Sequence, residues 1–189
     1  LNYEFISYDM FLDNIPTATV RHQIPINSVQ SKALCILNHS FSSLFMDEVG
    51  LGTNNYYHGL TPQESGLNSV VFFINNRLYP LRAYNPQTKN DYVLQINELV
   101  KALKSMNLQP KSLGDNSGSN LESYSNNYLV ARELARDGFV FDLRNAEAEI
   151  RLGFNAPRGA GTVGVIRSNT FVFSKKIVQT TANGVQVIH

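Results

Sequence analysis

The sequence predicts an all-β fold, an antiparallel β-sandwich with one or two helices inserted in long connections between strands. Three observations support this prediction. Short apolar segments with period-two alternation recur along the chain. Turn-forming pairs such as Asn-Asn and Asn-Gly separate several of these segments. Helical periodicity is convincing in a single segment.

Three strands are predicted in the first quarter of the chain. Residues 1–12 are rich in aromatic side chains, which is typical of strands. Residues 17–24 alternate between apolar and polar, and Pro16 and Pro25 stand at their ends, where proline is tolerated. The side of this segment that we expect to be buried carries Ala18, Val20, His22 and Ile24. Residues 33–37 form a continuous apolar run, which favours a fully buried strand.

Two long loops and one hairpin are predicted next. Residues 47–68 and 108–123 are rich in polar and turn-forming residues, and loops of this length are commonly functional. Between them, residues 70–79 contain two apolar runs separated by Asn75 and Asn76. Because asparagine tolerates a positive φ, this pair predicts a tight hairpin.

A helix is predicted over residues 90–106, with Asn90 or Thr88 as its cap. Its apolar positions follow i, i+3, i+4, i+7 spacing, and we expect them to face the core. They are Tyr92, Val93, Ile96, Leu99, Val100, Leu103 and Met106. The polar side is expected to carry Gln95, Glu98, Lys101 and Lys104. A weaker pattern predicts a short helix over residues 126–137 that ends at Gly138.

The last third of the chain returns to strand patterns. Residues 139–141 are apolar, and Ile150, Leu152 and Phe154 alternate with charged residues or glycine. The remaining predicted strands cover residues 162–173, 175–181 and 185–188, with a type I′ turn at Asn183 and Gly184 before the last.

Composition and charge narrow the range of functions. Charged residues make up only 16% of the chain and the net charge is +1, so no strong field favours nucleic acid or an anionic membrane. A surface built from neutral polar side chains suits a molecule that packs against many neighbours. No apolar stretch approaches the ~20 residues of a membrane-spanning helix. We therefore expect no specific nucleic-acid partner and no membrane span.

No residue pattern predicts a catalytic, cofactor-binding or metal site. The single cysteine, Cys35, lies in an apolar run and is expected to be a buried, inert thiol. The histidines lack the close spacing of a metal site, and they are His22, His39, His58 and His189. The sequence contains no G-x-S-x-G nucleophile elbow. We therefore predict no catalytic residue, no cofactor and no metal, and expect that the chain is not an enzyme.

Several motifs have simpler explanations than the functions they suggest. Residues 159–164 match G-x-G-x-x-G, but β-branched and aromatic residues follow instead of a helix, so we interpret them as a loop. The sequon Asn38-His39-Ser40 is of a kind that arises often by chance. We expect the nearby carboxylates to be solvated, namely Asp137, Asp142, Glu147 and Glu149. A second set of charged residues is expected either to be solvated or to contact other proteins, and it consists of Arg132, Arg136, Arg144, Arg151, Arg158 and Arg167.

Three segments resemble a known family. Val70–Pro80 (VVFFINNRLYP) is similar to an element made of a strand, a short turn and Tyr-Pro. Asp137–Asn145 (DGFVFDLRN) resembles an aromatic-Asp-Leu segment, and Val163–Ile188 is similar to a closing strand pair. These elements occur in the major capsid proteins of small double-stranded DNA viruses of eukaryotes: virophages, Polinton-like viruses and adintoviruses. The resemblance covers about residues 68–189.

The resemblance implies a jelly-roll fold and a structural role. Members of the family have two jelly rolls in tandem, and three copies form a pseudo-hexagonal capsomer of an icosahedral capsid. We therefore expect residues 1–189 to be a single jelly-roll domain, the C-terminal half of a longer or processed protein, since the chain begins without methionine. The implied partners are copies of the chain, neighbouring capsid subunits and minor capsid proteins, in a virion capsid assembled inside the host cell. The family has no catalytic residues to transfer.

Two alternatives stay open at this point. A receptor- or carbohydrate-binding β-sandwich would use Tyr56, Tyr57 and His58 to stack on a sugar, although the chain has no Trp to offer a larger face. An enzyme with spatially assembled residues would need a deep pocket with perturbed titratable groups. For the capsid interpretation, we expect residues 47–68 or 108–123 to contact another chain.

Overall fold

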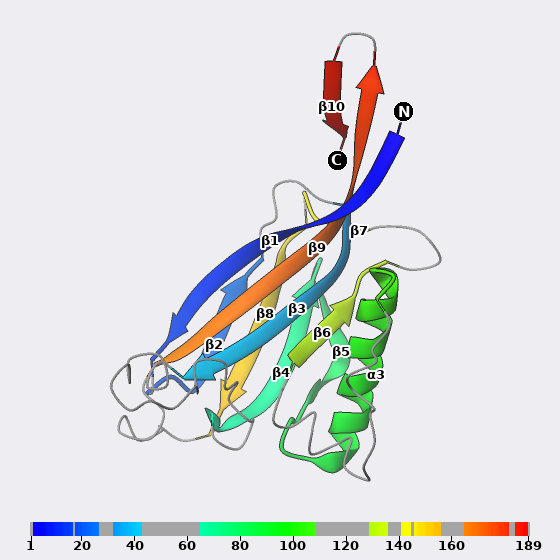
Figure 1. Ribbon diagram of the computed structural model, residues 1–189. Coiled ribbons are helices and arrows are strands. Elements are labelled where there is room, and N and C mark those ends of the chain that lie inside the picture. The colour runs from blue at the N-terminus through cyan, green and yellow to red at the C-terminus, as the bar shows by residue number, and fades with distance from the viewer. Residues whose placement is uncertain are drawn as a thin grey trace, which may run out of the picture.

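Two antiparallel sheets pack against each other in the computed structural model (Figure 1). The structure describes residues 2–16, 18–26, 32–42, 65–108, 129–135, 141–144, 146–155, 165–181 and 184–188. Sheet A has the spatial order β1 (Asn2–Ile15), β9 (Ile166–Thr181), β3 (Lys32–Ser42) and β6 (Leu129–Glu133). Two short strands extend it: β10 (Gly184–Ile188) pairs with the end of β9, and β7 (Phe141–Asp142) pairs with the start of β3. Sheet B has the order β2 (Arg21–Pro25), β8 (Ala148–Phe154), β4 (Leu67–Ile74) and β5 (Arg77–Tyr84).

Successive strands are divided between the two sheets in the manner of a jelly roll. β1 and β2, β3 and β4, and β5 and β6 each place one member in either sheet, and every pairing is antiparallel. One described helix, α3 (Lys89–Ser105), lies in the long connection between β5 and β6. The predicted fold class, an all-β sandwich with a helix in a long connection, is confirmed.

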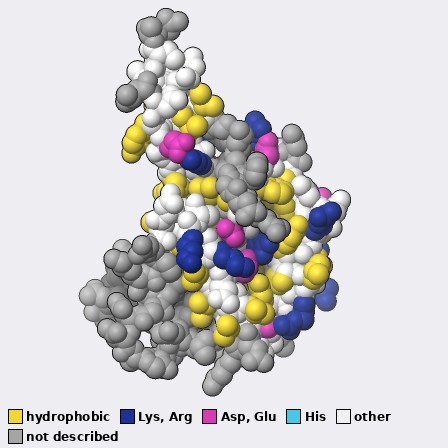
Figure 2. Space-filling view, turned by 90° about the vertical axis from the view of Figure 1, so that its right-hand side faces the viewer, with side chains coloured by type: hydrophobic (Ala, Val, Ile, Leu, Met, Phe, Trp, Pro, Cys, Tyr) yellow, Lys and Arg dark blue, Asp and Glu magenta, His cyan; other side chains and the backbone are white. Residues whose placement is uncertain are grey.

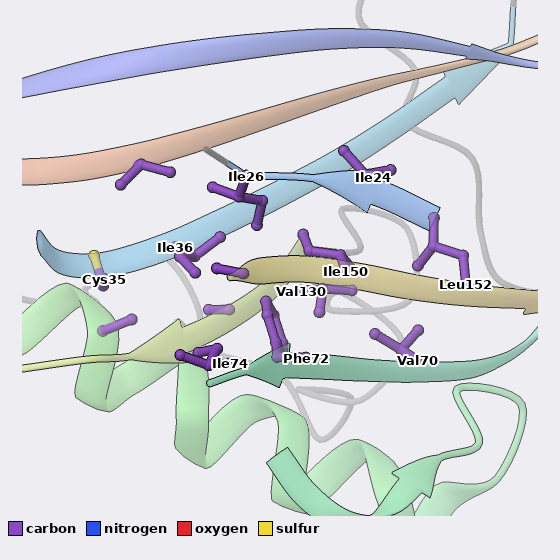
Figure 3. Close-up of a cluster of buried hydrophobic side chains, with 14 of the residues drawn as sticks. Ile24, Ile26, Cys35, Ile36, Val70, Phe72, Ile74, Val130, Ile150 and Leu152 are labelled. Carbon is purple, nitrogen blue, oxygen red and sulfur yellow. The ribbon is translucent and has the colours of Figure 1, made fainter. Parts of the chain in front are cut away.

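Both sheets contribute apolar side chains to the core (Figure 3). Sheet B provides one face of β8 and β4, where Ile150 and Phe72 are fully buried. Sheet A provides Ile36 from β3 and Val172 from β9, which lie opposite each other in the register. Each fully buried side chain of this kind stabilises the fold by about 1.5–3 kcal/mol. The predicted alternation in β8 is confirmed, because every second residue of this strand is buried.

The predicted hairpin is also confirmed. Asn75 and Asn76 connect β4 to β5 with φ angles of 49° and 62°, the left-handed region that asparagine tolerates. β4 begins at Leu67, so the last two residues of the loop predicted at 47–68 belong to a strand instead. The rest of that loop up to residue 64 lies outside the described residues.

The second strand is shorter than predicted. The amide of Thr19 donates to the carbonyl of Pro16 at 3.0 Å, so a turn uses the residues that were expected to start this strand. Pairing with β8 begins at Arg21, and Ala18 and Val20 are exposed. Of the side predicted to be buried, Ile24 is in the core and His22 is half-buried, so the alternation holds for two positions of four.

The helix lies where the sequence predicts it, with Thr88 at the N-cap, but it is rotated. Its buried stripe consists of Asp91, Gln95, Leu99, Ala102 and Met106, which have helical spacing on one face. Asp91 fixes this rotation by accepting hydrogen bonds from Arg82 Nη2 (2.6 Å) and the amide of Asn85 (2.7 Å). Gln95 therefore lies inside and Val93 is 51% exposed, which contradicts the predicted places of these two residues.

The prediction of a helix over residues 126–137 is wrong, because Leu129–Glu133 form the strand β6. This strand pairs with β3, with Asn38 opposite Val130 and Ile36 opposite Arg132. Both Val130 and Ala131 are buried. A ladder of backbone hydrogen bonds together with this burial outweighs the helical propensity of the segment, which is worth only tenths of a kcal/mol per residue, roughly.

The predicted strands at residues 162–173 and 175–181 are described from residue 165 on, and together they form one long strand, β9, from Ile166 to Thr181. Ser174 joins them because it is buried and pairs with both Ser7 and Ala33, so no turn interrupts the ladder. The predicted strand at 139–141 is described only at Phe141, the first residue of β7. Gly184 begins β10 with a φ of 130°, but Asn183, the other residue of the predicted turn, lies outside the described residues.

Candidate assembly surface

Strand β1 presents its apolar side to the outside of the sandwich. Alternate residues Ile6, Tyr8, Met10 and Leu12 are 40%, 59%, 55% and 60% exposed, and we call them the β1 stripe. The other side of the strand carries Phe11, the buried Ile15 and three half-buried polar residues. These are Ser7, Asp9 and Asp13, which lie opposite the buried Ser174, Val172 and Ser168 of β9. A strand that turns its apolar side away from the core has an unpartnered surface.

Aromatic side chains of β9 extend the β1 stripe across sheet A. In the register, Tyr8 lies opposite Phe173 and Met10 lies opposite Phe171, so these residues share one face. The ring of Tyr8 contacts Phe171 edge-on at a centroid distance of 5.7 Å and Phe173 at 5.8 Å. These contacts hold the exposed Tyr8 in one place, which makes it suitable as an anchor for a partner.

An arm projects from the body of the sandwich (Figure 1). It consists of the start of β1, the end of β9 and β10, with β9 in the middle of the three strands. All of β10 is exposed, including Val185, Val187 and Ile188. Lys175 and Glu4 form an ion pair across the base of the arm. A small ribbon with exposed apolar residues has little core of its own, so it too is a candidate contact surface.

A hollow lies between α3, β5 and β6, and we call it the α3 groove. Its volume is about 520 Å³, and its apolar lining is Ile74, Tyr79, Leu134, Ala135 and Phe141. Its charged lining is Glu98, Lys101, Arg132 and Glu133. Figure 2 views this side of the molecule, where hydrophobic side chains are interspersed with Lys, Arg, Asp and Glu.

Ion pairs fix the charged residues of the α3 groove. Glu98 accepts from Arg132 Nη1 at 2.7 Å and from Lys101 Nζ at 2.9 Å. The guanidinium of Arg132 also lies 4.8 Å from the centre of the Tyr79 ring. Burial raises the pKa of the neighbouring Tyr84, and the charges of Glu98 and Asp91 add to this effect. The groove is therefore a hollow in which Glu98, Lys101 and Arg132 are already paired with one another.

A second hollow of about 590 Å³ lies at the base of the arm. Its lining includes Tyr3 and Ile6 of β1, Leu34 of β3 and Ser105 at the end of α3. A third, of about 500 Å³, lies beside β2 and β8 and includes His22 and Arg151. His22 is bound there at Nε2 by Asp13 Oδ2, at 2.6 Å, which ties β1 of sheet A to β2 of sheet B.

The residues that suggested chemistry have structural roles where the structure describes them. Cys35 is fully buried, and desolvation raises the pKa of its thiol to about 12, as expected for an inert thiol. Asn38 of the sequon is 2% exposed, and its Nδ2 donates to Ser168 Oγ and Thr170 Oγ1, both at 2.8 Å. A glycan therefore has no access to this amide in the folded chain.

The charged residues singled out in the sequence mostly pair with each other. Arg144 binds Asp142, and Arg151 binds Glu149 while its guanidinium lies 4.0 Å from the centre of the Phe73 ring. Glu147 is exposed just before β8. The Gly-rich motif at 159–164 lies outside the described residues, but β9 and not a helix follows it. The strand that the sequence predicts after the motif is therefore present, and the motif's role as a loop stays a prediction.

Several predicted features lie outside the described residues. These are His58 and His189, the side chain of His39, Asp137, Arg136, Arg158, the loop positions Tyr56 and Tyr57, and residues 109–123 of the second predicted loop. In the described part of the chain, no three His, Cys, Asp or Glu residues are grouped so as to hold a metal ion. None of its helices is both long and apolar enough to span a membrane.

The sequence interpretation missed the β1 stripe, although a signal was present. Residues 5–13 alternate between two sets, and the set with Ile6, Tyr8, Met10 and Leu12 is the more apolar one. Alternation alone predicts that this set lies inside. Only the pairing with β9, whose inner residues include Ser168 and Thr170, shows that it lies outside.

Comparison with solved structures finds the same fold in viral capsids. The VP54 protein of PBCV-1, fitted into a cryo-EM reconstruction of the virophage Sputnik, is similar with a TM-score of 0.53 and 10% identity, over 100% of this chain and 52% of that one. The quasi-atomic model of the PBCV-1 capsid gives the same values. The mavirus major capsid protein has a TM-score of 0.47 and 10% identity, over 99% and 40% of the two chains.

These comparisons establish the fold of the chain. Its fold is the jelly roll of double jelly-roll viral capsid proteins, and the chain spans about half the length of the first of these structures. At the level of sequence, no family model and no curated protein matches it.

Proposed function

We propose that this chain is a structural domain of a viral capsid protein, one jelly roll that assembles with copies of itself into trimeric capsomers. One observation carries the proposal: the whole chain superimposes on half of a capsid protein with a TM-score of 0.53. Convergence of a fold does not by itself establish function, so the surface must agree as well. The β1 stripe and the arm supply exposed apolar area of the kind that subunit interfaces cover.

The small share of charged residues supports the same proposal. A capsid subunit buries large areas against its neighbours, and few charges then lose their hydration. In a chain with two jelly rolls, three such domains would form alternate lobes of a pseudo-hexagonal capsomer. The proposed location is the virion capsid, with minor capsid proteins and neighbouring capsomers as further partners and with assembly inside the host cell. We propose that the chain contributes contacts between subunits and no catalytic step.

The test is the oligomeric state of the full-length protein that contains these residues. Size-exclusion chromatography with light scattering should give the mass of three chains, and negative-stain images should show lobed particles of uniform size. A protein that stays monomeric at all concentrations up to the solubility limit would contradict the proposal.

A further inference from the structure

We infer that β10 of one copy pairs edge to edge, in antiparallel fashion, with β10 of a second copy, and that this contact joins two capsomers. The pairing depends only on this chain, whereas its place between capsomers rests on the proposed function. Two identical strands that pair in this way are related by a two-fold axis, which joins two copies and cannot close a ring of three. The second copy therefore belongs to another trimer.

β10 is an edge strand without the usual protection. Soluble proteins prevent the unpaired backbone groups of an edge strand from pairing with other chains by placing charges or prolines along it. Every other edge strand in the described part of the chain carries such residues: Glu4, Asp9 and Asp13 in β1, Arg21 and Pro25 in β2, Arg77, Pro80 and Arg82 in β5, Arg132 and Glu133 in β6, and Asp142 in β7. β10 has no charged residue and no proline, and β9 is its only partner among the described strands. Its outer edge is therefore a template for a further strand.

The position of β10 makes this edge accessible. The strand lies on the arm that projects from the sandwich (Figure 1), and all five of its residues are exposed. Val185, Val187 and Ile188 are 68%, 49% and 45% exposed. A short strand with little core of its own gains a second row of backbone hydrogen bonds and apolar burial when another strand is added beside it.

The sequence of β10 favours a second β10 as the added strand. The segment Val185-Gln186-Val187 reads the same in both directions. An antiparallel pair centred on Gln186 therefore places Val185 of each copy opposite Val187 of the other, and the two Gln186 side chains opposite each other. Valine packs well against a cross-strand neighbour, and paired glutamine amides can bind each other. Because no charge is present, no like charges meet across the axis.

The same pairing extends one apolar face across two arms. In the register of the arm, Val178 lies between Tyr3 and Val187, so these three residues form a row on one face. In the antiparallel pair, Val185 of the second copy continues this row. Two arms of three strands each then become one six-stranded ribbon. A contact of five residues per copy is far smaller than the roughly 800 Å² per partner of a stable interface, so we expect it to be weak alone and to act through the three arms of each trimer.

Disulfide formation at one engineered position tests the pairing in the full-length protein that contains these residues. Gln186→Cys places two thiols opposite each other across the axis, at a Cα separation of about 4.5–5.5 Å that a disulfide accepts. Mild oxidation should give covalent dimers on a denaturing gel and linked trimers in solution. Gln179→Cys is the matched control, because Gln179 lies opposite Gln186 on β9, one strand further from the axis, and it should give no covalent dimer. Native Cys35 does not compete, since it is buried and the pKa of its thiol is about 12.

Charges at the same position give a second readout. Gln186→Lys and Gln186→Glu each place two like charges opposite each other, so each should weaken the association of trimers by about fivefold. An equimolar mixture of the two variants should restore the association, because each lysine then meets a glutamate. Light scattering over a dilution series measures the association, and unchanged circular dichroism shows that the variants fold.

The outcomes separate the pairing from the proposed function. If Gln186→Cys gives no more covalent dimer than Gln179→Cys, or if the mixture of charged variants restores nothing, the pairing of β10 with β10 is overturned. A trimeric wild-type protein would still support the proposed function in that case. Covalent dimers of a protein that never forms trimers would support the pairing but overturn the proposed function, together with the place of the contact between capsomers.

Discussion

The two edges of sheet A are treated differently by the chain. At the β6 edge, α3 covers the strand, buries Leu99 and Ala102 and forms the Arg132–Glu98 ion pair. At the β1 edge, 14 residues pair with β9 and with no other described strand, and the stripe from Ile6 to Leu12 is exposed. This difference shows that the long β5–β6 connection, which contains α3, covers one edge from within the chain. The other edge has the features of a surface that a partner completes.

The largest expected difference between the edges is in folding stability. Leu99→Ala at the covered edge should lower the free energy of unfolding by about 2–5 kcal/mol, because it leaves a cavity under the helix. Val93→Ala on the exposed side of the same helix should cost far less, below about 1 kcal/mol. Urea denaturation measures both. Similar costs for the two variants would show that α3 does not seal this edge.

The ion pair at the covered edge gives the next effect. Arg132→Ala removes a hydrogen bond to Glu98 and the contact with Tyr79, so we expect a loss of about 1–3 kcal/mol. Arg144→Ala is the control, because Arg144 pairs with Asp142 on the exposed surface and its loss should leave the denaturation curve unchanged. If Arg132→Ala also leaves the urea midpoint unchanged, the ion pair does not hold the helix.

Alkaline pH should lower the stability of the fold through Cys35, which is buried on β3 between the two edges of sheet A. The pKa of its thiol rises from 9.0 to about 12 on folding, so above pH 9 the unfolded chain releases a proton that the folded chain keeps. Stability therefore falls between pH 9 and 12, by up to about 1.4 kcal/mol per pH unit. Urea midpoints at pH 8 and 10 measure this, and Cys35→Ala should have a smaller slope. An identical slope would place the titrating group elsewhere.

The smallest effect on folding is expected at the uncovered edge. Tyr8→Ser should lower the free energy of unfolding by only about 0.5–1 kcal/mol, because the side chain faces outward and loses its ring contacts with Phe171 and Phe173. Phe11→Ser on the inner side of the same strand should cost about 1–3 kcal/mol, since Phe11 packs against the core. Thermal denaturation at low protein concentration separates the two. A large loss for Tyr8→Ser would mean that the stripe serves the fold of the isolated chain.

Local signals account for the parts of the fold that the sequence predicts correctly. Asn75 and Asn76 have the backbone preference of a tight turn, and the alternation around Ile150 suits a strand with one buried face. β6 was missed because nothing within Leu129–Glu133 indicates that β3 lies beside it. The rotation of α3 was missed because it depends on Arg82 and Asn85, which bind Asp91 from outside the helix.

The candidate surface illustrates the same limit more strongly. The apolar set in β1 would lie inside if hydrophobicity alone decided the orientation. In the structure, the inner side of β9 carries Ser168 and Thr170, which Asn38 binds through two hydrogen bonds. The polar inner residues of β9 include Ser168 opposite Asp13 and Ser174 opposite Ser7, and the apolar set of β1 faces outward. Such long-range pairing cannot be read from one segment.

The unbroken course of β9 has a mechanical consequence. The same 16-residue strand lies in the body and in the arm, and β1 accompanies it over 14 paired positions. A load applied to the arm along this axis would act on many hydrogen bonds at once in shear, because these bonds run perpendicular to the strands. We expect the arm to behave as a stiff tether, able to transmit tension from a neighbouring molecule directly into the sandwich.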